Sequence, residues 1–413
     1  MNISIIVLII VFSLIAIRKI GKYKLPIWLV MLLGSLAVII TGQISLVDSF
    51  KSINFDVIFF LFGMFIVGKA LFESGYLYSI SYKIFNKAKS VDNLILLLLF
   101  TMGFFSSLLM NDTIAIIGTP LVLYFAKSHK VSSKMLLLTL CFSITIGSVM
   151  TPIGNPQNLL IAIDGGLTNP FFDFIKFLFI PTVINIFITY LLLKLFFNKE
   201  FHKIELTHTY EDIKNPHLAM LSKISLILII FLIVIKILFV FLKVNFEFRL
   251  TYIALIGALP IVIFSKERFH ILKKVDWFTL IFFISMFILM QSVWNSNFFQ
   301  SLLSRTNLNL KSIPVILFLS TTISQFISNV PFVALFIPLL KHIGASTKEM
   351  LMLACGSTIA GNLFILGAAS NIIVIQNAEK NGETITFLEF SKIGIPLTII
   401  NIFVYYGFQF LIK

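Results

Sequence analysis

Residues 94–126 read LILLLLFTMGFFSSLLMNDTIAIIGTPLVLYFA, an apolar run with a polar tip, Asn111-Asp112-Thr113, near its centre. Basic loops flank this run on both sides, with Lys83, Lys87 and Lys89 before it and Lys127, Lys130 and Lys134 after it. Basic loops stay in the cytoplasm, so a segment that crossed once would put one of these loops outside. We therefore predict a re-entrant hairpin whose two arms are too short to span independently.

The whole chain is nearly as apolar as this run. Of its 413 residues, 58% are hydrophobic and 12% are charged, and the mean hydropathy is +1.02. This composition cannot supply the polar surface of a soluble domain, and the runs lack the alternation of barrel strands. We predict a second hairpin at 312–340 and spans at 3–17, 26–41, 55–72, 135–163, 174–197, 224–242, 250–264, 276–294, 350–378 and 392–411.

Charge also sets the orientation. The loop from Arg18 to Lys24 is basic and the loop from Asp48 to Asp56 is mixed, which predicts that the first loop is cytoplasmic and both termini are outside. We expect a multi-pass protein of the plasma membrane. The net charge of +14 is explained by cytoplasmic basic loops, so no nucleic-acid partner is expected. One predicted cytoplasmic loop, Glu379 to Glu389, is acidic and departs from the rule.

Several motifs recur in order along the chain. Gly34, Met64-Phe65-Ile66, Asn111 with Pro120, Cys141 with Gly147, and Gly154 to Asn158 match Gly257, Met286-Phe287-Ile288, Asn329 with Pro338, Cys355 with Gly361, and Gly367 to Asn371. Each copy holds five spans and one hairpin, and an odd number of spans inverts the second copy. The predicted fold is an all-α polytopic membrane protein of two inverted five-helix repeats, each with a re-entrant hairpin: residues 1–197, a cytoplasmic linker 198–223, and residues 224–413.

Four polar stretches interrupt helices at mid-membrane: Asn111 to Thr113, Thr151 to Asn158, Ser328 to Pro331, and Gly367 to Asn371. Lipid cannot hydrogen-bond backbone, so such breaks persist only inside protein or along a cavity. Broken helices expose N–H groups that attract anions and C=O groups that attract cations; the alternative is that Gly and Pro merely kink packed helices. The candidate substrate- or ion-binding residues are Asn111, Asp112, Thr113, Thr151, Gly154, Asn155, Asn158, Ser328, Asn329, Gly367, Ser370 and Asn371.

Asp112 is the only carboxylate predicted at the membrane midplane, which makes it a functional candidate. Burial favours the protonated form and would let Asp112 carry a proton, whereas bound Na⁺ would keep it ionised. The structural alternative is a helix cap that accepts the N–H groups after it. The two interpretations are compatible and both stay open.

Enzymatic chemistry is not expected. All six histidines fall in polar loops, and Cys141 and Cys355 lie in apolar runs. The chain therefore offers no nucleophile–base pair in a span, no disulfide framework and no metal-ligand set. No cofactor is expected beyond Na⁺ or H⁺ as a coupling ion.

The paired tips and breaks resemble the signatures of the ion transporter superfamily, which includes citrate-transporter-like permeases, arsenite efflux permeases, one type of sodium/proton antiporter and divalent anion–sodium symporters. The resemblance covers nearly the whole chain. It implies a homodimer with a scaffold part and a moving transport part. The symporter branch uses Ser-Asn-Thr at both tips, whereas this chain has Met110-Asn111-Asp112 and Ser328-Asn329-Val330, which argues against a dicarboxylate.

These observations favour an ion-coupled permease for a small inorganic or organic anion, working by alternating access. A cation/proton antiporter with Asp112 as the exchange site is the first alternative. An arsenite efflux permease is the second, although the absence of cysteine at either tip argues against thiol capture.

Overall fold

The computed structural model describes residues 3–17, 19–20, 23–24, 26–85, 88–201, 213–242, 249–298, 301, 309–327, 329–379 and 381–411. Two short strands, β1 (Lys19–Ile20) and β2 (Tyr23–Lys24), pair antiparallel. The helices of these residues are α1 (Ile3–Ile17), α2 (Ile27–Ile40), α3 (Leu46–Ser52), α4 (Phe55–Ser74), α5 (Tyr76–Phe85), α6 (Val91–Leu109), α7 (Asn111–His129), α8 (Ser133–Gly147), η1 (Ser148–Met150), α9 (Pro156–Asp164), α10 (Pro170–Phe196), η2 (Asn198–Glu200), α11 (Pro216–Phe241), α12 (Leu250–Phe264), α13 (Arg268–Lys273), α14 (Trp277–Asn295), α16 (Ile313–Ile327), α17 (Asn329–His342), α18 (Thr347–Leu363), η3 (Ile365–Gly367), α19 (Ala369–Glu379) and α20 (Phe387–Phe408).

The prediction of a helical membrane protein is confirmed, although the hairpin of β1 and β2 was not predicted. Within the described residues, seven helices are long and apolar enough to cross a membrane: α4, α6, α8 with η1, α10, α11, α14 and α20. Shorter apolar helices are α2, α12, α16 and α17. The spans predicted at 135–163 and 350–378 are each interrupted, as their polar stretches indicated, so neither is one continuous helix.

Local sequence explains where the helices begin. Asn54 caps α4 by accepting the N–H of Val57, and a proline opens α9 and α10, where its missing N–H costs no helical bond. Ser346 with Glu349, and Thr386 with Glu389, form capping boxes at α18 and α20. These starts fall at the edges of the apolar runs because the caps are polar.

The arms of the first hairpin are longer than expected. The helices α6 and α7 have 19 residues each, because Ser90 caps α6 upstream of the apolar run and Lys127 to His129 complete the last turn of α7. The argument that both arms are too short to span therefore does not hold for this hairpin. It holds better for α16 and α17, which have 15 and 14 residues. The helix α11 begins at Pro216, inside the range assigned to the linker.

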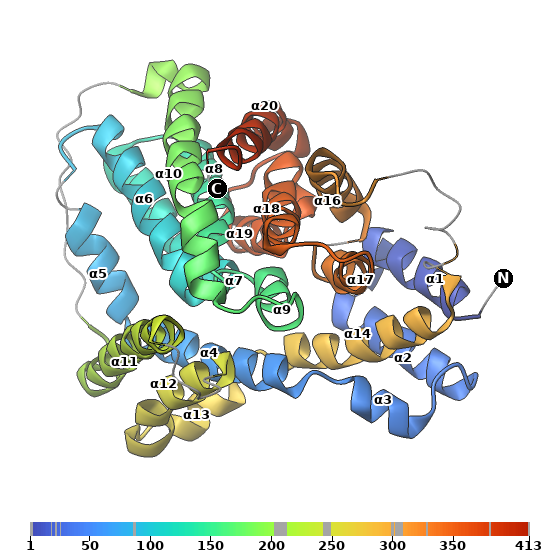
Figure 1. Cartoon of the computed structure of the whole chain (residues 1–413). Helices are drawn as coiled ribbons and strands as arrows, with labels where there is room; N and C mark the ends of the chain where they lie inside the picture. Colours follow the sequence, from blue (N-terminus) through green and yellow to red (C-terminus); the bar gives the residue numbers. More distant parts are fainter. Residues whose placement is uncertain are drawn as a thin grey trace.

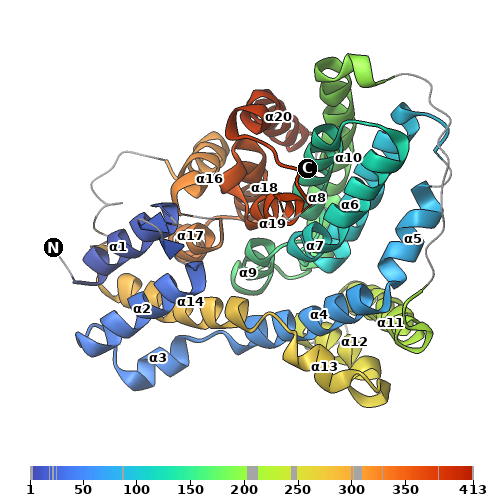
Figure 2. The same cartoon turned by 180° about the vertical axis from the view of Figure 1, so that it is seen from behind.

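Apart from α1 and α5, which contact both sides, the helices form two parts, which Figures 1 and 2 show from opposite sides. We call α2, α3, α4, α11, α12, α13 and α14 the platform, and α6 to α10 with α16 to α20 the bundle. Each sequence half contributes to both parts. In the platform, α4 packs against α12 and α2 against α14; in the bundle, α7 packs against α19, α9 against α17 and α10 against α20.

Candidate functional site

The tip of the first hairpin lies in the break between α8 and α9. The backbone N–H of Asn111 donates to the carbonyl of Gly154 over 2.9 Å. The Thr151 hydroxyl donates to the carbonyl of Ser107, near the end of α6. Met110, between the two arms, has a φ of 69°, a conformation that residues with a Cβ seldom adopt. The hairpin tip and the helix break thus form one polar unit.

Two buried asparagines, Asn155 and Asn158, hydrogen-bond the backbone of this break. Asn155 caps α9 by accepting the N–H of Asn158 at Oδ1 over 2.9 Å. The Nδ2 of Asn158 donates to the carbonyls of Ser148, Val149 and Thr151 over 3.0, 3.4 and 3.0 Å. These bonds satisfy carbonyls that the end of α8 leaves without helical partners, which is the requirement for broken helix away from water.

Thr358 of α18 joins the first break to the second half of the chain. Its Oγ1 lies 3.2 Å from Nδ2 of Asn155, 3.3 Å from Nε2 of Gln157 and 3.2 Å from Oδ1 of Asn158, to which it donates. A hydroxyl has one hydrogen and two lone pairs, so this one can serve all three amides. All four side chains are buried.

Gly154 and Gly367 are required by close backbone approach. A Cβ on Gly154 would lie 2.3 Å from the carbonyl oxygen of Ser148, and a Cβ on Gly367 would lie 2.6 Å from that of Ala360. No real Cβ fits at such distances, so any larger residue would open the break. Each glycine lets the chain fold back on the end of the preceding helix.

The second break is held by two carboxamides. The Nδ2 of Asn371 donates to the carbonyl of Gly361 over 2.6 Å. The Nε2 of Gln325, on hairpin arm α16, donates to the carbonyls of Ala360 and Thr321 over 2.7 and 2.9 Å. The two amides therefore bind consecutive carbonyls near the end of α18, one from the hairpin and one from α19.

Several side-chain oxygens of this region have no hydrogen-bond partner among the described residues. Oδ1 of Asn371, Oε1 of Gln325, Oδ1 of Asn329 and Oγ of Ser370 are buried and have no hydrogen-bond partner in the described part of the chain. Oε1 of Gln325 points at Gly367, where a Cβ would meet it at 2.7 Å. Buried polar atoms without partners are costly, and a group that consists of oxygens suits a cation.

Asp112 and Thr113 lie in the first turn of α7 and are partly exposed. The side chain of Asp112 caps nothing, because α7 starts without a side-chain cap and it is Asn111 whose Oδ1 accepts the Asp112 N–H at 2.9 Å. The carboxylate of Asp276, at the start of α14, repels a negative charge on Asp112. Thr113 packs against Gly68 of α4, where a Cβ would meet Cγ2 of Thr113 at 3.0 Å.

The predicted site residues thus fall into two groups. Asn111, Thr151, Gly154, Asn155 and Asn158 meet at the first break, and Gly367, Ser370 and Asn371 lie at the second. Four asparagines of the predicted site are buried, with Asn111 and Asn329 7% exposed and Asn158 and Asn371 0%. Ser328 lies outside the described residues. The role of all these residues in binding stays a prediction.

Some residues of the site were not predicted. Gln325 lies on α16, four residues before the polar tip at Asn329, and this closeness in the sequence could have identified it. Thr358 gives no signal, because a single threonine in an apolar run does not show what it faces.

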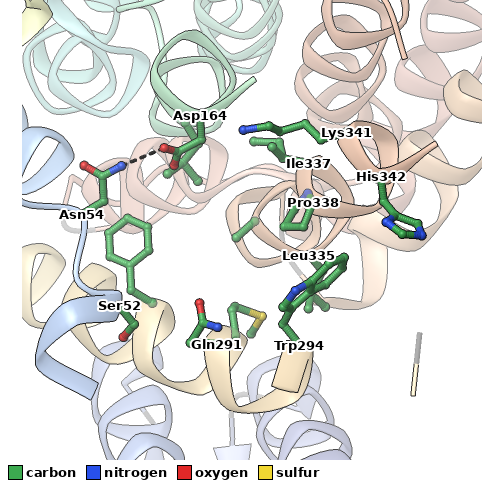
Figure 3. A pocket seen from close by; sticks show the side chains of 14 residues that line it. Ser52, Asn54, Asp164, Gln291, Trp294, Leu335, Ile337, Pro338, Lys341 and His342 are labelled. Carbon is green, nitrogen blue, oxygen red and sulfur yellow. Dashed lines mark hydrogen bonds between the residues drawn. The ribbon is translucent and has the colours of Figure 1, made fainter. Parts of the chain in front are cut away.

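A cavity of about 650 Å³ opens between the platform and the bundle. Figure 3 shows its lining: Ser52 and Asn54 come from the platform near α4, Gln291 and Trp294 from α14, Asp164 from α9, and Leu335, Ile337, Pro338, Lys341 and His342 from α17. Nδ2 of Asn54 donates to Oδ1 of Asp164 over 2.9 Å, and Lys341 acts on Asp164 electrostatically. None of the predicted site residues lines this cavity.

Residues 7–349 match the profile of a family described as citrate transporters. The chain belongs to this family. A 46 kDa membrane protein of Mycobacterium leprae is 27% identical, over 97% of this chain and 96% of the relative. A putative transporter, arsB, of Dictyostelium discoideum is 24% identical over 90% of this chain and 85% of the relative. In fold, the chain is similar to the YdaH transporter of Alcanivorax borkumensis, with TM-score 0.57 and 14% identity over 98% of this chain and 95% of that one.

The membership confirms the resemblance seen in the sequence. The protein is a multi-pass membrane transporter and not an enzyme. No group of three or more metal-ligating His, Cys, Asp or Glu side chains occurs among the described residues.

Proposed function

We propose that this protein is a secondary active transporter that moves a small anion by alternating access, coupled to Na⁺ or H⁺. The observation that carries the proposal is the seating of the hairpin tip at Asn111 in the break at Gly154, where 2.9 Å separates donor and acceptor. Such a contact places the start of α7 beside the break, and we propose that both lie near the middle of the membrane. Apolar side chains could pack a helix end at a lower cost in free energy than buried polar backbone. We therefore infer that the contact serves substrate binding and not packing alone.

Helix ends at the breaks suit an anion. The helices α7, α9, α17 and α19 all begin at a hairpin tip or a break. A helix N-terminus carries partial positive charge and free N–H groups, which bind carboxylates and oxyanions. The helices α7 and α19 pack against each other, as do α9 and α17, and we propose that their starts face a common region of the bundle.

The coupling cation fits the second break. Unpartnered oxygens of Gln325, Ser370 and Asn371 are hard ligands there, and Asn329, at the tip of the same hairpin as Gln325, has a further one. Broken helices of transporters use such groups and exposed carbonyls to hold Na⁺. The amide oxygens of Asn155 and Asn158 at the first break are already occupied. A cation bound at the second break would be coordinated by these unpartnered oxygens. Its positive charge would raise the affinity for an anion bound nearby.

Contacts between distant segments support the proposed topology. Glu73 pairs with Lys274 over 3.0 Å and Asp92 with Lys194 over 2.6 Å. The topology assigns Glu73, Asp92 and Lys274 to the cytoplasm and Lys194 to the cytoplasmic end of the span 174–197. A single crossing of 94–126 would place the members of each pair on opposite faces. The acidic loop that departed from the charge rule also finds partners there, because Glu389 pairs with Lys134 over 2.5 Å.

The order and packing of elements support the inverted repeat. The packing of α4 on α12 in the platform has a counterpart in that of α14 on α2. Asn54 and Asp276 cap α4 and α14 at corresponding places. Membership in the superfamily further suggests a homodimer, in which the platform would be the fixed scaffold and the bundle the moving part.

Flux measurements test the proposal. The purified protein in proteoliposomes should take up or exchange at least one anion from a panel of citrate, other carboxylates, phosphate and arsenite. The flux should depend on a Na⁺ or pH gradient. Cation–proton exchange without any anion flux would overturn the anion proposal and favour the antiporter, for which the carboxylate of Asp112 at the tip is the specific observation. Flux of arsenite alone would identify the arsenite permease.

A further inference from the structure

One hydrogen bond crosses from the platform to the bundle at the cavity of Figure 3. Nδ2 of Asn54 donates to Oδ1 of Asp164 over 2.9 Å. Asn54 is the N-cap of α4 and its Oδ1 accepts the N–H of Val57, so its amide has a fixed orientation. Asp164 is the last residue of α9, and α9 packs on α4. The bond therefore ties the half-helix that follows the first break to a platform helix.

The corresponding positions of the second half hold the same pair with amide and carboxylate exchanged. The match of Met64-Phe65-Ile66 with Met286-Phe287-Ile288 aligns Asn54 with Asp276. Asp276 is the N-cap of α14 and accepts the N–H of Thr279 over 3.1 Å, as Asn54 does for Val57. The match of Gly154 to Asn158 with Gly367 to Asn371 aligns Asp164 with Asn377, in the last turn of α19.

In this conformation Asp276 is engaged by its own helix. Its Oδ2 accepts the hydroxyl of Thr279 over 2.6 Å, and it is exposed. The helix α19, which carries Asn377, lies against α7, α8 and η3 within the bundle. The two halves therefore use equivalent residues in different ways in the same structure.

We propose that Asn54–Asp164 and Asp276–Asn377 are alternative latches between platform and bundle, one for each access state. The inference rests on the proposed alternating-access function and its inverted repeat. When two inverted copies exchange conformations, the molecule opens to the other face, and a contact made by one copy is then made by the other. Asn54–Asp164 holds the conformation described here, and Asp276–Asn377 holds the opposite one.

The chemistry of the two pairs fits this role. Each is an amide facing a carboxylate, so each latch provides a charge-assisted hydrogen bond of similar strength. A carrier needs states of similar free energy, because a large difference would trap it in one. In the Asn54–Asp164 latch the platform supplies the amide and the bundle the carboxylate. In the Asp276–Asn377 latch the platform supplies the carboxylate and the bundle the amide.

Disulfide crosslinking tests whether both contacts form. The two buried native cysteines, Cys141 and Cys355, are first replaced by alanine. Asn54→Cys with Asp164→Cys, and separately Asp276→Cys with Asn377→Cys, are then oxidised with copper phenanthroline in membranes and assayed by loss of maleimide labelling. Both pairs should crosslink, and each crosslink should block transport reversibly. Failure of the Asp276→Cys with Asn377→Cys pair to crosslink while the first pair does so would overturn the proposal.

A charge exchange tests the energetics. Asn54→Asp places two carboxylates at the Asn54–Asp164 latch and should shift the population away from this state by about tenfold or more, as expected for loss of a charged hydrogen bond. Adding Asp164→Asn should restore it. The readout is labelling of Gln291→Cys in the cavity by an impermeant maleimide, with Asp48→Asn as an exposed platform control. Unchanged labelling in Asn54→Asp would contradict the latch.

Crosslinking and labelling need no substrate, so the two proposals can fail separately. Two crosslinks without any anion flux would leave the latches standing and overturn the proposed function. Anion flux without the second crosslink would do the reverse.

Discussion

Asn158 and Asn371 make the same contact in the two broken helices. The Nδ2 of Asn158 donates to Ser148 over 3.0 Å and the Nδ2 of Asn371 donates to Gly361 over 2.6 Å, in both cases to a carbonyl ten residues earlier. Their oxygens differ, because Oδ1 of Asn158 accepts the Thr358 hydroxyl while Oδ1 of Asn371 has no partner in the described chain. The amide of Asn158 is thus fully used within the protein, whereas the oxygen of Asn371 stays available to a ligand.

This difference predicts different costs for the two alanine variants. Asn158→Ala leaves several buried carbonyls without donors, and each unsatisfied group costs about 1–3 kcal/mol. Asn371→Ala removes one such bond and should be milder. We expect a much lower melting temperature in detergent for Asn158→Ala than for Asn371→Ala, with Asn381→Ala, an exposed amide, as control. Equal losses for Asn158 and Asn371 would show that the extra bonds do not matter.

Ser370→Ala separates a binding role from a structural one. The Ser370 hydroxyl is buried and has no partner among the described residues, so its removal should leave stability unchanged or raise it slightly. If the oxygen holds the coupling cation, the cation concentration for half-maximal flux should rise by about tenfold, the equivalent of one lost interaction of roughly 1.4 kcal/mol. Ser357→Ala is the matched control, because that hydroxyl donates to the Leu353 carbonyl. A normal cation dependence in Ser370→Ala would exclude Ser370 as a ligand.

Asn329→Ala should abolish transport with little effect on folding. Asn329 lies at the second hairpin tip, is 7% exposed and keeps its Oδ1 unpartnered within the described chain. Loss of one side-chain hydrogen bond would cost only about 0.5–1.5 kcal/mol of stability. Flux in proteoliposomes and size-exclusion profiles give the two readouts. Full flux at normal expression would remove the second tip from the proposed site.

Asp112→Asn tests the coupling role of the first tip. The variant preserves the shape of the side chain and removes its charge and titration. A proton-coupled carrier should lose its dependence on the pH gradient, while exchange without a gradient survives. Wild-type gradient-driven flux in Asp112→Asn would exclude Asp112 from coupling and leave the anion site to the helix N-termini and the asparagines.

Thiol labelling tests the topology. Lys89→Cys and Lys130→Cys, on either side of the first hairpin, should react with an impermeant maleimide only after cells are permeabilised. Lys341→Cys, at the cavity of Figure 3, should react in intact cells. Labelling of only one of Lys89→Cys and Lys130→Cys from outside would show that 94–126 crosses once.

The breaks were predictable from the sequence because Gly, Pro and Asn together in the middle of an apolar run disfavour a continuous helix. Gly154 and Gly367 could be recognised for this reason, and the structure shows the backbone contacts that require them. The ends of helices were less accessible. Polar residues such as Ser90 and His129 extend α6 and α7 past the apolar run, and hydropathy alone assigns these residues to loops.

Contacts between elements that are distant in the sequence could not be derived from one sequence. Thr358 and Gln325 complete the two breaks from elements distant in the chain, and nothing local marks which of many buried hydroxyls and amides do so. The short helices α3 and α13 were also missed, because amphipathic helices of 7 and 6 residues carry too few apolar positions to resemble spans.

The interleaving of the two halves has a consequence for biosynthesis. While the ribosome is still making the second half, α4 and α2 lack α12 and α14, the helices on which they pack in the finished molecule. Until those partners are made, the faces of α2 and α4 that are buried in the finished molecule must contact lipid or the insertion machinery. The platform can therefore assemble only after α14 (Trp277–Asn295) has been made. A chain truncated after α10 would keep its membrane helices but present uncovered surfaces to cellular quality control.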